Sequence, residues 1–256
     1  MMDEPMTASG VPRAPRFLAI GSGKGGVGKT WLAITLTHAL ARRGRRMLLV
    51  DADFGLANVD IQLGLMPRHD IADVLAGRVP FEQAIQRHEA GGFDVLAGRS
   101  GSGTLASLDR ARIDPLLSRL RTHGAGYDHV VLDLGAGLDG AVRHTAAWAD
   151  ALIVVATSEP TSLTDAYATL KLYAADRPDG DARLVVNQAA SPAAAARTAE
   201  TLMRACTSFL GRAPALLGSV RRDSRVPDTI RHQVPMLTRH PTAGASQDVE
   251  RLAMLL

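Results

Sequence analysis

The residues Gly21-Ser22-Gly23-Lys24-Gly25-Gly26-Val27-Gly28-Lys29-Thr30 lie directly after the apolar run Phe17–Ile20 and before an amphipathic segment that begins at Trp31. This order predicts a strand, a glycine loop and a helix. The part from Gly23 to Thr30 fits G-x-x-x-x-G-K-[ST], in which glycines let successive backbone N–H groups turn inward around phosphate oxygens. The following helix adds the positive end of its dipole. The sequence therefore predicts a phosphate-binding loop in which Lys29 reaches the β- and γ-phosphates and Thr30 binds Mg²⁺.

A dinucleotide-binding loop is the alternative for the same residues. Gly21, Gly23 and Gly26 also satisfy G-x-G-x-x-G, and Asp51 closes the next predicted strand roughly where a ribose-binding acid would lie. The chain has only three lysines among its 29 Lys and Arg residues, and two of them stand in the loop, where a compact ammonium suits phosphate better than a planar guanidinium. We therefore favour a nucleoside triphosphate, with contacts from Gly23, Lys24, Gly25, Gly26, Val27, Gly28, Lys29, Thr30 and Trp31.

The composition predicts a single α/β domain. The chain has 256 residues, of which 46% are apolar, and this is enough for one large core but short for two. Its net charge of +3 permits binding to an acidic surface without requiring it. Residues 1–15 contain Asp3, Glu4 and three prolines without an apolar core, so we expect a disordered tail there and one domain over residues 16–256.

The cysteine content and the hydropathy pattern bear on the cellular location. The single cysteine, Cys206, excludes a disulfide framework and a cysteine-only metal site within one chain. This usage is typical of an intracellular protein. No apolar run approaches the 18 residues of a membrane span. The sequence therefore predicts a cytoplasmic protein, with peripheral attachment to the inner membrane or cell pole as an open possibility.

Apolar runs alternate with amphipathic segments along the chain. This alternation predicts a mostly parallel sheet covered on both faces by helices, that is, a three-layer α-β-α sandwich. The predicted strands are Phe17–Ile20, Met47–Val50, Phe93–Leu96, His129–Leu132, Ala151–Ala156, Leu184–Val186 and Ala215–Gly218. The predicted helices are Trp31–Arg43, Ile71–Gly77, Pro80–Arg87, Leu108–Thr122, Ser162–Ala175, Ala193–Leu210 and Ser246–Leu255.

Three aspartates follow predicted strands. Asp51 and Asp53 end the second strand, and Asp133 follows four apolar residues in a Walker B pattern. Ligands of open parallel sheets bind at the carboxyl ends of the strands, where these acids would lie. One such aspartate alone would more simply cap a turn, but two alternate aspartates one strand from the loop favour a ligand. We predict that Asp133 holds Mg²⁺ through water.

The run Lys24-Gly25-Gly26-Val27-Gly28-Lys29-Thr30 resembles the deviant Walker A motif of the MinD/ParA family of P-loop ATPases (SIMIBI class). The resemblance implies ATP and Mg²⁺ as cofactors and an ATP-closed homodimer in which Lys24 reaches the nucleotide of the partner chain. It also implies that Asp51 belongs to the Mg²⁺ shell, that Asp53 orients the attacking water and that Asn187 hydrogen-bonds adenine. Asn58 matches a motif residue to which we assign no role.

The segment Glu159-Pro160-Thr161-Ser162-Leu163-Thr164-Asp165-Ala166-Tyr167 resembles a run of the FlhG/FleN branch, the flagellar-number ATPases. From the residues alone it is a loop entering a helix, with Thr161 or Ser162 as the cap and Asp165 near the helix start. Leu134 departs from the family, which usually has a small or hydroxyl residue there. This departure leaves the metal role of Asp133 intact and bears on the contacts of the loop Gly135–Gly137.

Two further segments bear on partners. Arg221, Arg222, Arg225 and Arg231 form the densest basic cluster, which we interpret as a solvated face or an acidic partner site rather than a DNA-binding site, since no aromatic residues accompany the charge. The apolar residues of Val249–Leu256 are expected to complete the core, so membrane association is only weakly indicated.

The resemblance implies a slow Mg²⁺-dependent ATPase, stimulated by a protein partner, that controls the placement or number of a cellular structure, with the flagellum as the first candidate. Two alternatives stay open. One is a partition ATPase that binds nonspecific DNA, and the other is a nucleotide-binding scaffold with negligible turnover.

Overall fold

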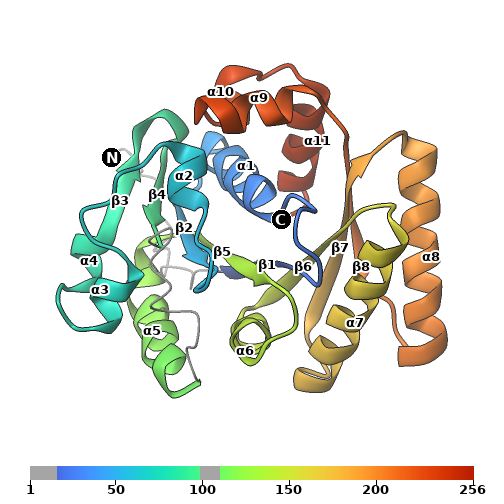
Figure 1. Ribbon diagram of the computed structural model, residues 1–256, viewed down its shortest axis with the longest axis horizontal. Helices are drawn as coiled ribbons and strands as arrows, with labels where there is room; N and C mark the ends of the chain where they lie inside the picture. Colours follow the sequence, from blue (N-terminus) through green and yellow to red (C-terminus); the bar gives the residue numbers. More distant parts are fainter. Residues whose placement is uncertain (1–15, 99–109) are drawn as a thin grey trace, which may run out of the picture.

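The computed structural model describes residues 16–98 and 110–256, so the predicted tail lies outside the described residues (Figure 1). The described residues form one eight-stranded sheet in the order β3-β4-β2-β5-β1-β6-β7-β8. All neighbouring strands run parallel except β3 and β4, which are antiparallel. The strands are β1 (Arg16–Ser22), β2 (Met47–Ala52), β3 (Ile85–His88), β4 (Phe93–Leu96), β5 (His129–Ala136), β6 (Ala151–Ala156), β7 (Asp181–Ala189) and β8 (Ala215–Arg221).

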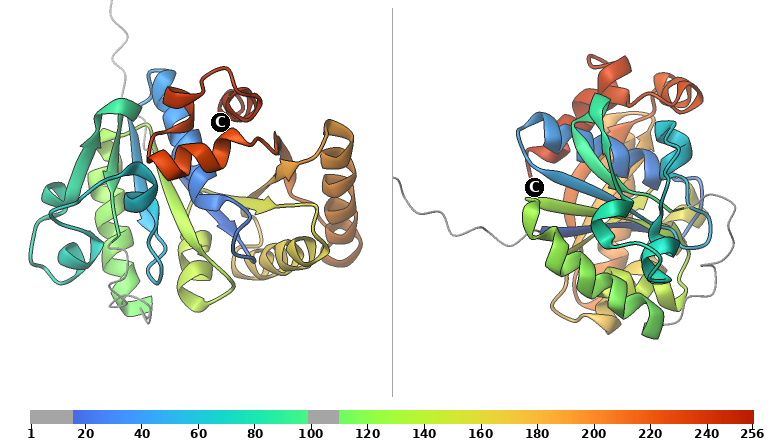
Figure 2. Two further views of the ribbon diagram at one scale, coloured as in Figure 1. Left: turned by 45° about the horizontal axis from the view of Figure 1, so that its top comes forward. Right: turned by 90° about the vertical axis from the view of Figure 1, so that its left-hand side faces the viewer.

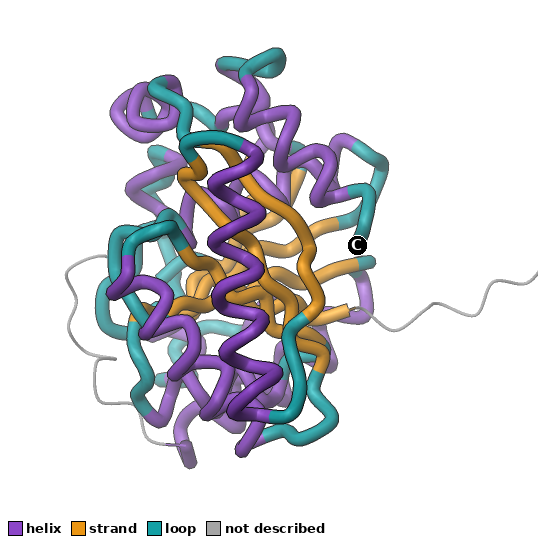
Figure 3. The backbone as a smooth tube through the Cα atoms, turned by 90° about the vertical axis from the view of Figure 1, so that its right-hand side faces the viewer, coloured by secondary structure: helices purple, strands orange, loops and turns teal. Residues whose placement is uncertain are grey.

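Helices cover both faces of this sheet, which confirms the predicted three-layer sandwich (Figures 1 and 2). One face carries α1 (Lys29–Arg42), α2 (Val59–Leu63), α9 (Arg225–His232), α10 (Met236–Arg239) and α11 (Gly244–Ala253). The other face carries α3 (Ile71–Leu75), α4 (Phe81–Ala84), α5 (Arg110–His123), α6 (Gly140–Trp148), α7 (Pro160–Asp176) and α8 (Pro192–Leu210). Figure 3, seen from the side of α8, shows the strands between the two helical layers.

The central strand β1 shows why these residues form a buried parallel strand. Phe17 and Ala19 pack into the core on one face, and Leu18 and Ile20 pack into the core on the other. Because successive side chains of a strand point to opposite faces, a strand covered on both sides must be apolar at every position. All four residues are fully buried.

The strand register brings the predicted acids to the phosphate loop. β5 lies between β1 and β2, and Asp133 pairs with Ile20 on one side and with Asp51 on the other. The loop between β1 and α1 leaves the same edge of the sheet. The chain crosses over β5 on its way from β1 to β2, and this crossover places the loop and the two acids together.

Some predicted boundaries were wrong. The predicted helix Pro80–Arg87 stops at Ala84, because residues 85–88 pair with β4 as an antiparallel edge strand. β5 does not end before Asp133 but continues to Ala136, since Leu134 pairs with Ala52 and is buried. The helix predicted from Leu108 is described from Arg110 onward, so its first two residues lie outside the described part.

The sequence did not reveal four helices, namely α2, α6, α9 and α10. Three of them have at most eight residues, so a 3.6-residue period has little length in which to show. The fourth, α6, has a signal that was missed, because the Asp139 side chain accepts a hydrogen bond from the Val142 amide as a helix cap.

The C-terminal helix completes the core, as predicted. Val249, Leu252 and Ala253 are buried on the face of the sheet that also carries α1. In the described residues no helix has the length and hydrophobicity needed to span a membrane.

Candidate nucleotide-binding site

The phosphate loop joins β1 to α1, and two of its glycines, Gly26 and Gly28, have positive φ angles that other residues rarely adopt. Gly28 has φ 91° and precedes α1, and its carbonyl accepts the first helical hydrogen bond from Leu32 N–H. Gly23 allows a close approach to α7, since a Cβ atom there would lie 2.5 Å from the Asp165 carbonyl oxygen. The 14-residue helix α1 has no acid in its first turn, so its positive end is free to act on an anion in the loop.

Lys29 lies at the start of α1 and is buried, with 8% of its surface exposed. Burial lowers the pKa of its ammonium, while the charges of Asp133 and Asp53 act in the opposite direction. A buried cation is costly unless an anion compensates it. Lys29, which is predicted to reach the β- and γ-phosphates, is therefore a cation that a bound anion would stabilise.

Asp51 and Asp133 pair side by side on the neighbouring strands β2 and β5, near their carboxyl ends, and each is 1% exposed. Burial raises the pKa of Asp51 to about 7, although it accepts N–H bonds from Asn58, Val59 and Asp53. Burial and the charge of Asp51 raise the pKa of Asp133 to about 8. The two carboxyl groups repel each other when both are ionised.

A divalent cation fits this pair. The Oδ1 atom of Asp133 is buried without a hydrogen-bond partner among the described residues, and the Thr30 hydroxyl hydrogen-bonds to the same carboxylate. Carboxylate and hydroxyl oxygens are the ligands that Mg²⁺ prefers, and the ion usually keeps waters and substrate phosphates as its other ligands. The described residues contain no group of three His, Cys, Asp or Glu that could hold a metal ion.

Asp53 lies in the loop that follows β2 and packs against the end of β5. Its Oδ1 atom accepts N–H bonds from Gly55 (3.3 Å) and Leu56 (2.9 Å). A Cβ atom on Gly135 would lie 3.2 Å from the same oxygen, so Asp53 packs against the segment that follows Asp133. The structure thus brings Asp53 to the predicted catalytic edge, and its role in orienting water stays a prediction.

Lys24 contacts residues at the start of α7 in its own chain. Its Nζ atom donates to Glu159 Oε2 (2.5 Å) and to Thr161 Oγ1 (2.9 Å). The bond from Lys24 lowers the pKa of Glu159. The sequence reasoning missed both partners, although an acid at the end of β6 on the edge that carries the loop was a usable signal. The predicted reach of Lys24 into a partner chain requires these contacts to break.

The start of α7 differs from its predicted capping. The helix begins at Pro160 with Glu159 as the N-cap residue, and no side chain caps it. Ser162 Oγ accepts from Thr157 N–H, and Thr161 faces Lys24. The predicted cap at Thr161 or Ser162 was therefore wrong, because Pro160, which suits the first helical position, starts the helix earlier.

Asn187 lies against the phosphate loop, and it is buried. Its Nδ2 atom donates to the Val27 carbonyl (2.8 Å), and its Oδ1 atom accepts from Gln188 N–H (2.9 Å). Its contact with adenine stays a prediction. Trp31 is buried on α1, and Leu134 is buried in the core beside Gly21, so neither side chain points into solvent at the loop.

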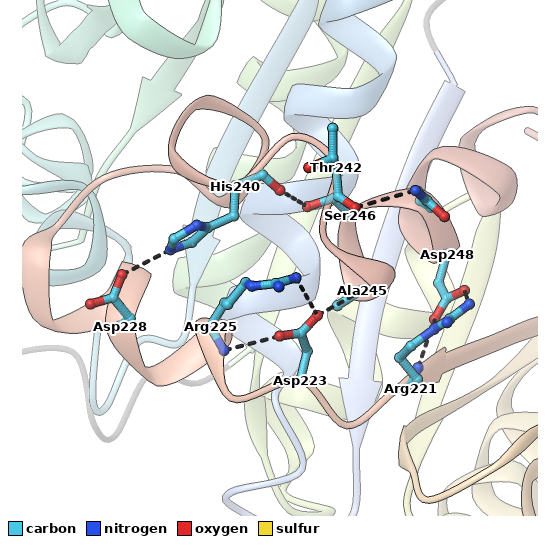
Figure 4. Close-up of polar contacts among 10 residues, drawn as sticks. Arg221, Asp223, Arg225, Asp228, His240, Thr242, Ala245, Ser246 and Asp248 are labelled. Carbon is cyan, nitrogen blue, oxygen red and sulfur yellow. Dashed lines mark hydrogen bonds and ion pairs between the residues drawn. The ribbon is translucent and has the colours of Figure 1, made fainter.

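Two arginines of the predicted basic cluster, Arg221 and Arg225, lie beside acids (Figure 4). Arg221 makes two side-chain hydrogen bonds to Asp248 at 2.8 and 2.9 Å. Arg225 lies 3.9 Å from Asp223. These partners reduce the positive potential of Arg221 and Arg225, and the Arg221–Asp248 contact links the end of β8 to α11.

The chain resembles known nucleotide-binding proteins over most of its length. Residues 18–236 match the CobQ/CobB/MinD/ParA nucleotide-binding domain. Antiactivator FleN of Pseudomonas aeruginosa is 33% identical over 231 residues, which are 90% of this chain and 82% of FleN. Flagellum site-determining protein YlxH of Helicobacter pylori is 28% identical over 94% of this chain and 81% of its own. In the solved MinC:MinD cell division protein complex of Aquifex aeolicus, a chain superposes with a TM-score of 0.77 at 27% identity, covering 94% of both chains.

Proposed function

The chain belongs to the CobQ/CobB/MinD/ParA nucleotide-binding family as an ATPase of the MinD/ParA type, and on this premise we propose that ATP closes it into a homodimer that controls the number or placement of flagella. Hydrolysis reopens the dimer. The observation that carries the proposal is that buried Lys29 lies by the buried pair of Asp51 and Asp133, because the charges that these groups give one another do not offset the cost of their burial, and a triphosphate with Mg²⁺ would.

Each site residue has a role in this proposal. The loop backbone and Lys29 hold the triphosphate, and Thr30, Asp51 and Asp133 hold Mg²⁺ directly or through water. The ion, when bound, supplies positive charge at the β- and γ-phosphates. Asp53, which two backbone N–H groups already fix, orients the attacking water. Lys24 leaves Glu159 and serves the nucleotide of the second chain.

The flagellar assignment is supported by the relatives rather than by the site. FleN is named an antiactivator and YlxH a flagellum site-determining protein, and both align with more than four fifths of this chain. The segment Pro160–Tyr167 resembles that branch and lies at the nucleotide edge, where Thr161 contacts Lys24. A protein partner of the flagellar or positioning machinery is therefore part of the proposal, as is a cytoplasmic location.

The DNA-partition alternative has weaker support, because acids pair with Arg221 and Arg225 (Figure 4). Retention of the ATP-bound protein on nonspecific DNA, lost at high salt, would favour that alternative. Phosphate release measured with and without candidate partners would separate an active switch from a scaffold with negligible turnover.

Light scattering with ATP and Mg²⁺ tests the dimer, with Lys24→Ala as the decisive variant. We expect the wild-type chain to dimerise with ATP only, and Lys24→Ala to bind ATP but to stay monomeric. Asp53→Ala should accumulate as the dimer because its turnover is slow. A Lys24→Ala variant that dimerises like the wild type would refute the role of this lysine across the interface.

Deletion of the gene followed by a count of flagella tests the cellular role, and an unchanged number and placement would refute it.

A further inference from the structure

Two consecutive side chains at the end of β7 bind two consecutive carbonyls of the phosphate loop. Asn187 Nδ2 donates to the Val27 carbonyl at 2.8 Å, and Gln188 Nε2 donates to the Gly26 carbonyl at 3.2 Å. The two residues also bind each other, since Asn187 Oδ1 accepts the Gln188 N–H. Asn187 is 3% exposed, so water does not compete for its contact.

The backbone of Gln188 is held in an unfavourable conformation. It has φ 54°, and of the non-glycine residues that the structure describes only Gln188 and Gln233 have a positive φ. A non-glycine residue in this region is strained and is kept where the surroundings fix it, often at functional sites. Here the surroundings include the bond to Gly26.

Asn187 also fills the space beside Gly28. A Cβ atom on Gly28 would lie 2.5 Å from Asn187 Nδ2, and Gly28 has φ 91°. A side chain at position 28 and the Asn187 amide are therefore mutually exclusive. Asn187 and Gln188 together contact the three successive loop residues Gly26, Val27 and Gly28.

The geometry of the peptide bond turns these contacts into an orientation of the loop amides. In a planar trans peptide, the carbonyl of one residue and the N–H of the next point in opposite directions. The described residues contain no cis peptide bond. Fixing the carbonyls of Gly26 and Val27 toward β7 therefore directs the N–H groups of Val27 and Gly28 away from β7.

We infer that Asn187 and Gln188 are positioning residues that hold the Val27 and Gly28 amides toward the nucleotide phosphates, and we call this pair the β7 clamp. The inference rests on phosphate binding by the loop, which is part of the proposed function. It gives Gln188 a role that the sequence did not suggest. It also means that Asn187 serves the loop backbone, whatever contact it makes with a base.

Inorganic tripolyphosphate separates the clamp from a base contact, because it has phosphates and no base. We would measure its affinity and that of ATP, both with Mg²⁺, by titration calorimetry for the wild type, Gln188→Gly and Asn187→Ser. Loss of one hydrogen bond from the clamp should weaken both ligands by the same factor, about tenfold. Weaker ATP binding with unchanged tripolyphosphate binding would overturn the inference in favour of a base contact, and unchanged binding of both would also overturn it.

Gln188→Gly guards against a folding artefact, since glycine accepts a positive φ without strain. Its ligand-free melting temperature should not fall below that of the wild type. Gln233→Gly is the matched control. Gln233 also has a positive φ, of 56°, and its Nε2 atom also donates to a backbone carbonyl, but to that of Ile61, away from the loop. It should leave both affinities unchanged, and an equal loss of tripolyphosphate binding would overturn the clamp.

The wild-type measurements distinguish this inference from the proposed function. A wild type that binds both ligands but never dimerises would refute the switch and leave the clamp standing. A wild type that binds neither ligand would overturn both.

Discussion

Buried charges are compensated to different degrees in two regions of the molecule. One is the nucleotide edge of the sheet, which carries the phosphate loop, Asp51 and Asp133, and the other is the α9–α11 region. At the nucleotide edge, burial lowers the pKa of Lys29 and raises the pKa values of Asp51 and Asp133, so the charges that these groups give one another do not offset their burial. In the α9–α11 region, Asp248 is also buried, yet hydrogen bonds and charge from Arg221 hold its pKa below the usual value (Figure 4). Uncompensated charges point to a missing ligand, whereas matched charges point to a structural role.

Lys29→Ala should give the largest effect, since it removes the cation at the triphosphate. We expect turnover to fall by at least about 100-fold, the typical cost of removing a group that stabilises charge in the transition state. Phosphate release under saturating ATP measures it. The ligand-free variant should be at least as stable as the wild type, because it loses a buried ammonium whose burial Asp133 and Asp53 only partly offset. A variant with near-normal turnover would contradict the assignment.

Asp248→Ala should lower the stability of the protein and leave its turnover nearly unchanged, the opposite of Lys29→Ala. Arg221 and Arg251 would lose their shared partner, and we expect a loss of about 1–3 kcal/mol in unfolding free energy, less than for a fully buried pair because both arginines are partly exposed. Urea denaturation measures it. Turnover of the folded protein should stay within about twofold. A loss of turnover with unchanged stability would show that the α9–α11 charges belong to the site.

The pH dependence of the ligand-free protein sharpens the same contrast. The pKa values of Asp51 and Asp133 are raised in the folded protein to about 7 and about 8, from the ordinary aspartate pKa of 3.8. Between these pH values the folded state therefore keeps protons that the unfolded state has released. Stability should therefore fall as the pH rises from about 4 to about 8, by up to about 1.4 kcal/mol per pH unit for each proton. Denaturant melts at several pH values without Mg²⁺ would show it. A stability that rises over this range would mean that these acids are ionised in the folded protein.

Glu159→Gln should give the smallest effect. It removes the charge that pairs with Lys24 in the same chain while keeping the shape of the side chain. The pair is exposed, so its loss should cost little stability. Because Lys24 must leave Glu159 to reach a partner chain, ATP-dependent dimerisation should become a few-fold tighter. Sedimentation of the variant with ATP measures it, and weaker dimerisation would assign Glu159 to the interface instead.

The sequence revealed those parts of the fold that depend on long apolar runs and on the phosphate loop. β1, β2 and β5 were evident from continuous apolar runs, and the acids that directly follow two of these runs, Asp51 and Asp133, do lie side by side. The edge strand β3 was not evident, because only its pairing with β4 distinguishes residues 85–88 from a helix.

In the site, side-chain contacts between residues far apart along the chain could not be predicted from the sequence. Nothing in the local pattern relates Lys24 to Glu159, which is 135 residues away along the chain, or Gln188 to Gly26, 162 residues away. Such contacts depend on the crossover that places β1, β6 and β7 side by side.

The most direct test of the account is the stability of Asp133→Asn with and without Mg²⁺ and ATP. Removing one of two neighbouring buried carboxylates relieves their repulsion. We predict that the ligand-free variant melts at a higher temperature than the wild type, and that Mg²⁺ with ATP raises the melting temperature of the wild type but hardly that of the variant. A ligand-free variant that melts lower, together with an undiminished increase on adding Mg²⁺ and ATP, would contradict the account.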